Sequence, residues 1–194
     1  MRNTIVVVAF FILINAPIGY GVQPYSNAHV NTAYPFQTET QWIKFTSPEG
    51  RFAVLRPHEP KFETVNGTES NEVTNYRYSD LESGYGFICE YFDVKSTGDT
   101  LESFLDTTRD GIIRGAGATK TGEEKISMNS YPGRELQLAF TVNNGTEIAA
   151  QTRIFIVEKR LYSITFLHLK SMDALIASDL GKKFFSSFEL KAAR

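Results

Sequence analysis

The string Tyr131-Pro132-Gly133-Arg134-Glu135 contains the residue types of this sequence that come closest to a binding motif. A Pro-Gly pair turns the chain sharply, and the arginine after it carries a planar guanidinium that is always charged. Such a group binds a carboxylate or a phosphate through two parallel hydrogen bonds. Tyr131, Gly133 and Arg134 are therefore our candidate binding residues. The alternative is that the Pro-Gly pair only starts a strand, and that Arg134 pairs with neighbours of Glu135 at the sheet edge.

No other group of residues has the sequence spacing of a known catalytic or metal site. The histidines, His29, His58 and His168, are far apart, and none has a second ligand at a metal-binding spacing. The adjacent carboxylates of Glu123 and Glu124 are typical of a solvated turn or strand. The sequence also has no nucleophile elbow, no phosphate-binding loop and no dinucleotide-binding glycine fingerprint. We therefore predict no catalytic residues, no metal site and no cofactor.

Composition narrows the class of protein. The chain has 194 residues, a length that suits one domain with a real core. Lys and Arg number 20 against 22 Asp and Glu, so there is no basic excess to bind nucleic acid. The only cysteine, Cys89, lies in an apolar string and is predicted to be a buried thiol rather than a nucleophile. A single cysteine also leaves the fold without an intramolecular disulfide.

Residues 1–21 have the pattern of a secretory signal peptide. Arg2 supplies the positive charge, residues 5–14 are uninterruptedly apolar, and small residues follow at Gly19 and Gly21. An uncleaved membrane anchor is the alternative, but it would need about 20 apolar residues. No cysteine stands near the end of the run to accept a lipid. We predict a secreted or periplasmic protein that touches a membrane only if this segment is not cleaved.

The rest of the chain divides into a linker and one domain. Residues 22–41 are polar and show no sustained period, which predicts an exposed linker. Beyond it, runs rich in β-branched and aromatic residues alternate with turn residues, among them Asn66-Gly67 and Asn144-Gly145. Strands joined by such short turns are antiparallel. The predicted strands are residues 42–45, 52–55, 61–65, 72–78, 85–94, 119–128, 131–142, 146–157 and 161–169.

Two amphipathic helices are predicted to cover the sheet. The first spans residues 100–114, with Asp99 as its N-cap. The second begins after Ser171 as its N-cap, and the tail at residues 184–190 should then pack back onto the sheet edge. The last two strands are apolar on both faces, which indicates that helices cover the sheet on both sides.

Four strings in this order resemble the PsbP-like superfamily, named after an extrinsic protein of the photosynthetic oxygen-evolving complex. The strings are FTSPEGRFAV at 45–54, YPGRE at 131–135, RLY at 160–162 and FFSSFEL at 184–190. The resemblance is greatest to uncharacterised exported bacterial members and covers residues 42–190. It implies an α+β fold in one domain: an α/β/α sandwich whose central antiparallel sheet has about six strands, with helices on both faces. Members share architecture more than activity, so the resemblance implies no particular reaction.

These observations predict an exported, non-enzymatic, monomeric domain that binds an unknown partner protein or small molecule. The alternative is a carrier that holds an apolar small molecule in an internal pocket, lined by some of its 15 phenylalanines and 9 tyrosines. An enzyme with an unrecognised site is a third class. A contiguous apolar surface patch would favour the first reading, an internal cavity the second, and a cleft with converging titratable groups the third.

Overall fold

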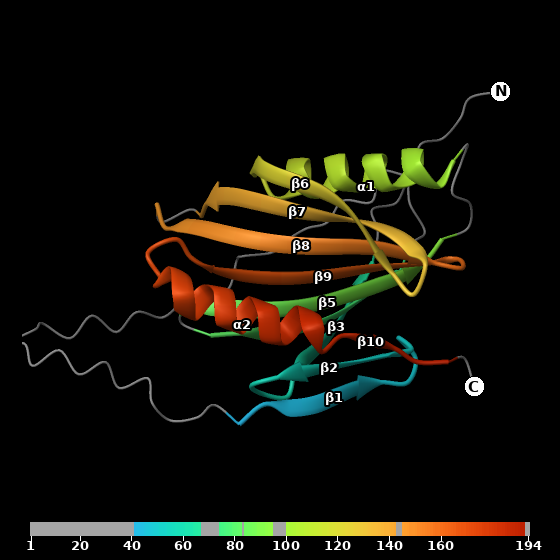
Figure 1. Cartoon of the computed structure of the whole chain (residues 1–194), viewed down its shortest axis with the longest axis horizontal. Coiled ribbons are helices and arrows are strands. Elements are labelled where there is room, and N and C mark those ends of the chain that lie inside the picture. Colours follow the sequence, from blue (N-terminus) through green and yellow to red (C-terminus); the bar gives the residue numbers. More distant parts are fainter. Residues whose placement is uncertain (1–40, 67–73, 83, 95–99, 143–144, 193–194) are drawn as a thin grey trace, which may run out of the picture.

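The computed structural model describes residues 41–66, 74–82, 84–94, 100–142 and 145–192. Most of them belong to a sheet of seven strands in the order β3-β4-β5-β9-β8-β7-β6, each antiparallel to its neighbours (Figure 1). Its strands are β3 Lys61–Asn66, β4 Thr74–Leu81, β5 Tyr85–Asp93, β6 Thr119–Met128, β7 Tyr131–Thr141, β8 Glu147–Val157 and β9 Arg160–Leu169. The antiparallel run from β6 to β9 confirms what the turn residues and strand patterns predicted.

A second, three-stranded sheet has the order β1-β2-β10. It contains β1 Ile43–Ser47, β2 Phe52–Arg56 and β10 Glu189–Leu190. In the turn between β1 and β2, the Ser47 hydroxyl accepts a hydrogen bond from the Gly50 backbone N–H at 3.0 Å, which confirms the predicted hairpin. The C-terminal tail packs onto the edge of this small sheet, because β10 pairs with β2.

Two helices lie on opposite faces of the large sheet (Figure 1). Helix α1, Leu101–Gly115, packs on β7 and β8. Helix α2, Ala174–Ser186, packs on β9 and on β2 of the small sheet. The predicted α/β/α sandwich is therefore present, with the small sheet sharing one outer layer with α2.

The two faces of the large sheet contribute to two separate cores. The core under α2 and the small sheet is mainly aromatic, and its buried members are Phe52, Val54, Phe87, Cys89, Tyr91, Phe155, Val157, Tyr162, Ile164, Phe166, Ala177, Phe184, Phe185 and Phe188. The core under α1 is mainly aliphatic, and its buried members are Phe92, Val94, Leu105, Ile112, Leu136, Leu138, Phe140, Ile148, Ala150, Ile154, Ile156 and Leu161. Side chains alternate between the two faces along each strand, so neighbours in sequence enter different cores.

Both predicted N-caps were wrong. The Thr100 hydroxyl, not Asp99, accepts the hydrogen bond from the Ser103 backbone N–H at 3.1 Å that caps α1. At α2 the Asp173 carboxylate, not Ser171, accepts from the N–H groups of the second and third helical residues at 2.9 and 3.2 Å. A carboxylate at this position also interacts favourably with the positive end of the helix dipole.

The hairpin predicted around Asn66-Gly67 is present, since β3 and β4 pair antiparallel. Asn66 itself is the last residue of β3 and pairs with Thr74, so β3 ends one residue later and β4 begins two residues later than the predicted strands 61–65 and 72–78. The second predicted tight turn falls partly on residues 143–144, which lie outside the described residues, as does the signal peptide and nearly all of the linker. Within the described ranges, neither helix is long and apolar enough to cross a membrane.

Candidate functional site

The structure places the three predicted binding residues on two different faces of β7. Tyr131 packs against the aromatic core, and Gly133 lies on the same face. Arg134 points to the other face, where its guanidinium meets helix α1. Successive side chains of a β-strand point to opposite faces of the sheet, so Arg134 lies on the face opposite to Tyr131 and Gly133. The three residues therefore do not form one site.

Arg134 is 2% exposed and is surrounded by carboxylates. It donates hydrogen bonds to the carboxylate of Glu102 in α1 and, at 3.2 Å, to Asp106 Oδ1 in the same helix. The Glu123 Oε1 atom of β6 lies 3.6 Å from the Arg134 Nε. The hydrogen bonds from Arg134 and Lys125 hold the pKa of Glu102 below its usual range. The guanidinium is thus engaged in attaching α1 to the sheet. Its predicted binding role stays a prediction.

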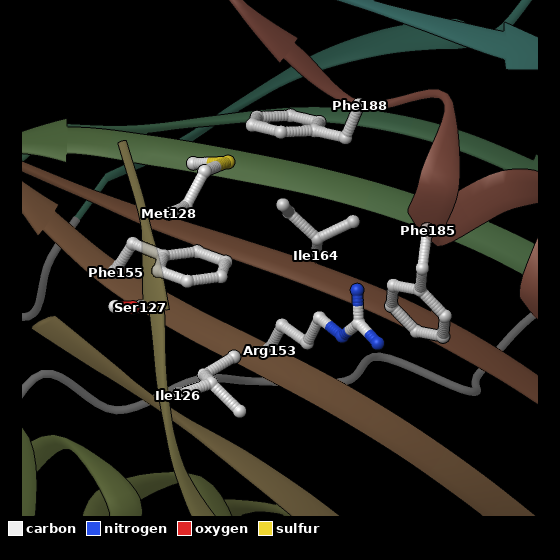
Figure 2. A pocket seen from close by; sticks show the side chains of 8 residues that line it. All are labelled: Ile126, Ser127, Met128, Arg153, Phe155, Ile164, Phe185 and Phe188. Atoms are coloured by element: carbon white, nitrogen blue, oxygen red, sulfur yellow. The ribbon is translucent and has the colours of Figure 1, made fainter. Parts of the chain in front are cut away.

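Strand partners of Gly133 and Tyr131 line a half-open pocket on the aromatic side of the sheet (Figure 2). In the sheet Gly133 pairs with Ile126 of β6 and Phe155 of β8, and Tyr131 pairs with Met128. A Cβ atom at Gly133 would lie 2.4 Å from the Ile154 carbonyl oxygen and 2.6 Å from the Phe155 ring. Glycine is therefore required there for β7 and β8 to pair while the Phe155 ring lies across them.

The pocket has a volume of about 290 Å³. Strands β6, β8 and β9 and the segment from the end of α2 to β10 supply its walls. The lining residues are Ile126, Ser127, Met128, Arg153, Phe155, Ile164, Phe185 and Phe188. All but Ser127 and Arg153 are apolar, and Figure 2 shows their side chains arranged around the Arg153 guanidinium.

Arg153 is the charged group of this pocket. Its guanidinium carbon lies 4.6 Å from the centroid of the Phe185 ring, a cation–π contact that holds the planar group against the pocket wall. Its Nε donates to Glu135 Oε2 at 2.6 Å, and its two terminal amino groups have no partner among the described residues. The pocket thus offers an apolar surface beside hydrogen-bond donors, which suits a small molecule with an apolar body and an anionic group.

No motif or spacing in the sequence singles out Arg153. It lies in an ordinary strand, and its pocket neighbours come from segments as far away in the chain as Ile126 and Phe188. The aromatic string at residues 184–188 is the one available signal, but the sequence predicts only that it packs on the sheet edge.

The structure also shows the surroundings of the cysteine, histidine and carboxylate residues that the sequence analysis discussed. Cys89 is buried as predicted, and burial raises its thiol pKa to about 12. His168 stacks on Phe166, and its Nδ1 lies 2.8 Å from the Leu169 carbonyl oxygen. Glu123 is not simply solvated, because it binds Arg109 at 3.1 Å. His29 lies outside the described residues.

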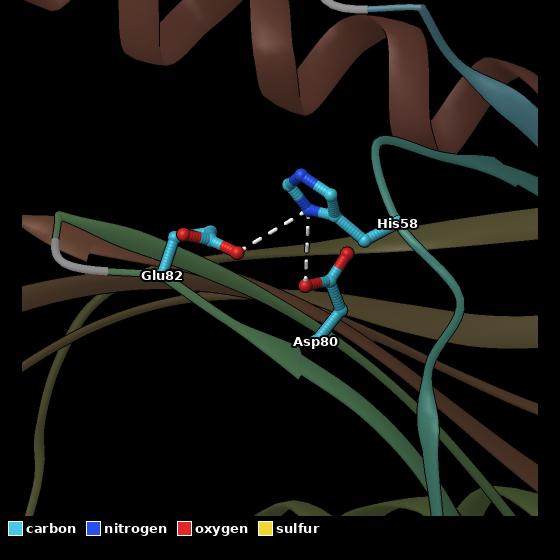
Figure 3. A group of neighbouring side chains, drawn as sticks. All are labelled: His58, Asp80 and Glu82. Atoms are coloured by element: carbon cyan, nitrogen blue, oxygen red, sulfur yellow. Dashed lines mark ion pairs between the residues drawn. The ribbon is translucent and has the colours of Figure 1, made fainter.

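The prediction that His58 has no other potential metal ligand near it was wrong, because the fold places two carboxylates beside it. Its Nδ1 lies 3.6 Å from Asp80 Oδ1 and 3.3 Å from Glu82 Oε1 (Figure 3). The two carboxylates come from the end of β4 and the turn after it, more than 20 residues along the chain. Only the pairing of β3 with β4 brings the β2–β3 loop to this end of β4.

No protein-family model matches the chain, and no curated protein sequence does. Among solved structures, the cyanobacterial PsbP of Synechocystis sp. PCC 6803 matches with a TM-score of 0.50 and 13% identity, over 84% of this chain and 98% of that one. The Saccharomyces cerevisiae Ran-binding protein Mog1p matches with a TM-score of 0.45 and 10% identity, over 77% and 95%.

A Bacteroides thetaiotaomicron protein matches with a TM-score of 0.45 and 13% identity over 77% of this chain, which spans about half (48%) of that protein's length. The match to cyanobacterial PsbP shows that the fold is PsbP-like, as the sequence resemblance implied. At this identity the likeness concerns the fold alone.

Proposed function

We propose that this PsbP-like chain is an exported binding protein without catalytic activity, and that the pocket around Arg153 binds a small amphipathic anion. The observation that carries the proposal is the presence of two unpartnered guanidinium donors inside an otherwise apolar pocket. The export rests on the signal-peptide pattern of residues 1–21.

The size of the pocket supports a small ligand. Its volume of about 290 Å³ is at the lower end of the range of small-molecule sites, roughly 300–1,000 Å³. That volume suits one aromatic ring system or a short aliphatic chain. Because the pocket is half-open, such a ligand enters and leaves without rearrangement of the sheet.

The lining also supports binding over catalysis. General acid–base catalysis needs a group that titrates near the working pH. The charged lining residue is an arginine, which does not give up its proton in proteins, and the other polar lining residue is Ser127. Arg153 is therefore not a general acid or base for a molecule bound in the pocket.

A partner protein has less support as the occupant. The large hydrophobic side chains exposed among the described residues are Phe62, Leu81, Leu175 and Ile176, and they lie on three different elements. A protein interface is usually marked by a contiguous apolar patch, which four exposed residues on three elements do not by themselves establish.

Methyl-detected NMR titration tests the proposal with three probe carboxylates: phenylacetate, indole-3-acetate and octanoate. We expect at least one to shift the methyl signals of Ile126, Met128 and Ile164 saturably, while those of Ile112 in the other core stay unchanged. The neutral analogue of that probe should bind more weakly, since it lacks the charge-assisted hydrogen bonds.

The variant Arg153→Met keeps the apolar stem and removes the donors. We expect it to weaken probe binding at least about tenfold, the loss of one charge-assisted hydrogen bond. Arg114→Met, which removes an exposed arginine at the end of α1, is the matched control and should bind like the wild type. Absence of saturable shifts with all three probes, or equal binding by Arg153→Met, would contradict the proposal.

A further inference from the structure

His58, Asp80 and Glu82 form a second cluster on the side of the molecule where β2 leads into β3 and β4 turns into β5. His58 lies in the loop between the two prolines Pro57 and Pro60, whose rings fix the backbone on either side. Glu82 is held by the turn, since its backbone N–H donates to the Tyr85 carbonyl oxygen at 2.8 Å. Backbone constraints thus hold two of the three side chains near the third, Asp80 of β4.

The two distances from His58 to the carboxylates match those between ligands around one small cation. His58 Nδ1 lies 3.6 Å from Asp80 Oδ1 and 3.3 Å from Glu82 Oε1, and donor atoms of the three residues all lie within 4.8 Å of one another. In a tetrahedral zinc site, ligands at about 2.0–2.2 Å from the metal stand roughly 3.3–3.6 Å apart. Figure 3 shows the imidazole and both carboxylates pointing toward one another.

Asp80 supplies an independent indication that a ligand belongs here. Its side chain is 5% exposed, and its Oδ2 is buried with no hydrogen-bond partner in the described part of the chain. A buried carboxylate oxygen without a donor is costly, so native structures usually provide a proton donor or a cation for it.

The neighbouring Arg56 does not fill that role. Its guanidinium is fully buried, and its two terminal amino groups donate to the carbonyl oxygens of Tyr78 and Phe87, at 3.3 and 2.6 Å. Its Nε has no partner in the described residues either. The carboxylate is therefore incompletely compensated by the protein itself.

We propose that His58, Asp80 and Glu82 bind a divalent first-row transition-metal ion, with zinc as the ion that this donor set suits best. One imidazole nitrogen and two carboxylate oxygens are ligands that zinc accepts, whereas calcium and magnesium prefer six or more oxygen donors. Three protein ligands leave a fourth position for water or for a group of another molecule. The exposure of His58 and Glu82, 53% and 42% of their side chains, leaves that position accessible from solvent.

Calorimetric titration of the EDTA-treated full chain with zinc sulfate tests this site. We expect one zinc ion per chain, and visible d–d absorption typical of four-coordinate Co²⁺ when cobalt is added instead. His58→Ala and Glu82→Gln should each weaken zinc binding at least about tenfold, since even partners that only support metal ligands contribute 10–100-fold. Both side chains are largely exposed, so the variants should unfold at the wild-type temperature.

Two matched variants control for nonspecific binding by surface groups. Glu59→Gln removes an exposed carboxylate from the same loop, and His168→Gln removes the other described histidine. Both should bind zinc like the wild type. The proposal is overturned if zinc does not bind saturably, or if His58→Ala binds it unchanged, in which case His58 is only an ion-pair partner of the two carboxylates. These outcomes do not depend on the pocket around Arg153.

Discussion

At the scale of single residues, Arg134 and Arg153 show that the surroundings of a guanidinium decide what it can do. Both stand on interior strands of the large sheet, but only Arg134 was predicted as a binding residue from the sequence. Arg134 faces α1, where Glu102 and Asp106 accept its hydrogen bonds. Arg153 faces the aromatic core, where one carboxylate accepts from Nε and the terminal amino groups remain unpartnered among the described residues. The side chain with unpartnered donors is the better candidate for ligand binding.

Replacing Arg134 should therefore affect stability rather than ligand binding. Removing one member of a fully buried ion pair costs about 3–5 kcal/mol, but Glu102 and Asp106 are about half exposed and stay solvated without it. For Arg134→Met we expect the free energy of unfolding to fall by about 1–3 kcal/mol, measured by urea denaturation. The exposed Arg114→Met should change it by less than about 0.5 kcal/mol.

The same variant also tests the binding role that the sequence suggested for Arg134. Probe binding to Arg134→Met should equal that of the wild type wherever the variant is folded. Weakened binding without a loss of stability would instead return Arg134 to the binding site and contradict its assignment to the attachment of α1.

At the scale of elements, the sequence predicted the strands well, because turn residues and alternating side chains are local signals. The caps were less predictable, since Asp99 and Thr100 are both capable of capping, as are Ser171 and Asp173. Which residue caps the helix depends on which is the last extended residue before the helix once the helix has packed on the sheet. For α1 that residue is Thr100, at φ −143° and ψ 157°. Docking is a tertiary effect that a local pattern does not contain.

The candidate sites were still less predictable, because each is assembled across elements. The Arg153 pocket needs β6 to lie beside β7, β7 beside β8, and α2 to pack over that face. The His58 cluster needs the register that pairs Lys61 with Ser79. Gly133 was predicted as a site residue from its Pro-Gly context, yet its place beside Phe155 depends on strand order, which the sequence did not provide.

The contacts of α1 make acid pH a test of how this helix is held. Hydrogen bonds from Arg134 lower the pKa of Glu102. On β6, hydrogen bonds from Lys120 and from Arg109 of the helix lower the pKa of Glu123 against the opposing effect of burial. Groups with a lowered pKa in the folded state stabilise it fully above their unfolded pKa of about 4, and this contribution is lost as the pH falls through the folded values. The carboxyls of Asp80 and Glu90, whose pKa values burial raises, have the opposite effect.

Acidification from pH 6 toward pH 3 should thus loosen α1 before β4 and β5. Amide hydrogen exchange, corrected for the intrinsic effect of pH, should show protection lost first in α1. Glu102→Gln should reduce this difference, because it removes one of the titrating groups. Simultaneous loss of protection in α1 and in β4–β5 would show that the ion pairs do not hold the helix.

At the scale of the whole molecule, the pairing of β5 with β9 determines the strand order of the large sheet and the character of its two cores. Nine residue pairs join these strands although α1 and three strands separate them in sequence. Their pairing places β9 and β8 in the middle of the sheet and produces two cores of different character. The aliphatic core is closed by α1, whereas the aromatic core is covered by α2 and the small sheet and opens at the Arg153 pocket.

Export is the prediction that concerns the entire chain, and mass spectrometry of the exported fraction of a bacterial host tests it. An apolar run of ten residues, residues 5–14, falls within the usual 7–15 residues of a signal peptide and is short of the roughly 20 that span a bilayer. We expect the mass of residues 22–194. Val7→Glu, which places a charge in the run, should abolish export; uncleaved chain retained in the membrane fraction would instead establish an anchor. Measured under native conditions, an additional mass that Arg153→Met loses would link the exported form to the pocket ligand.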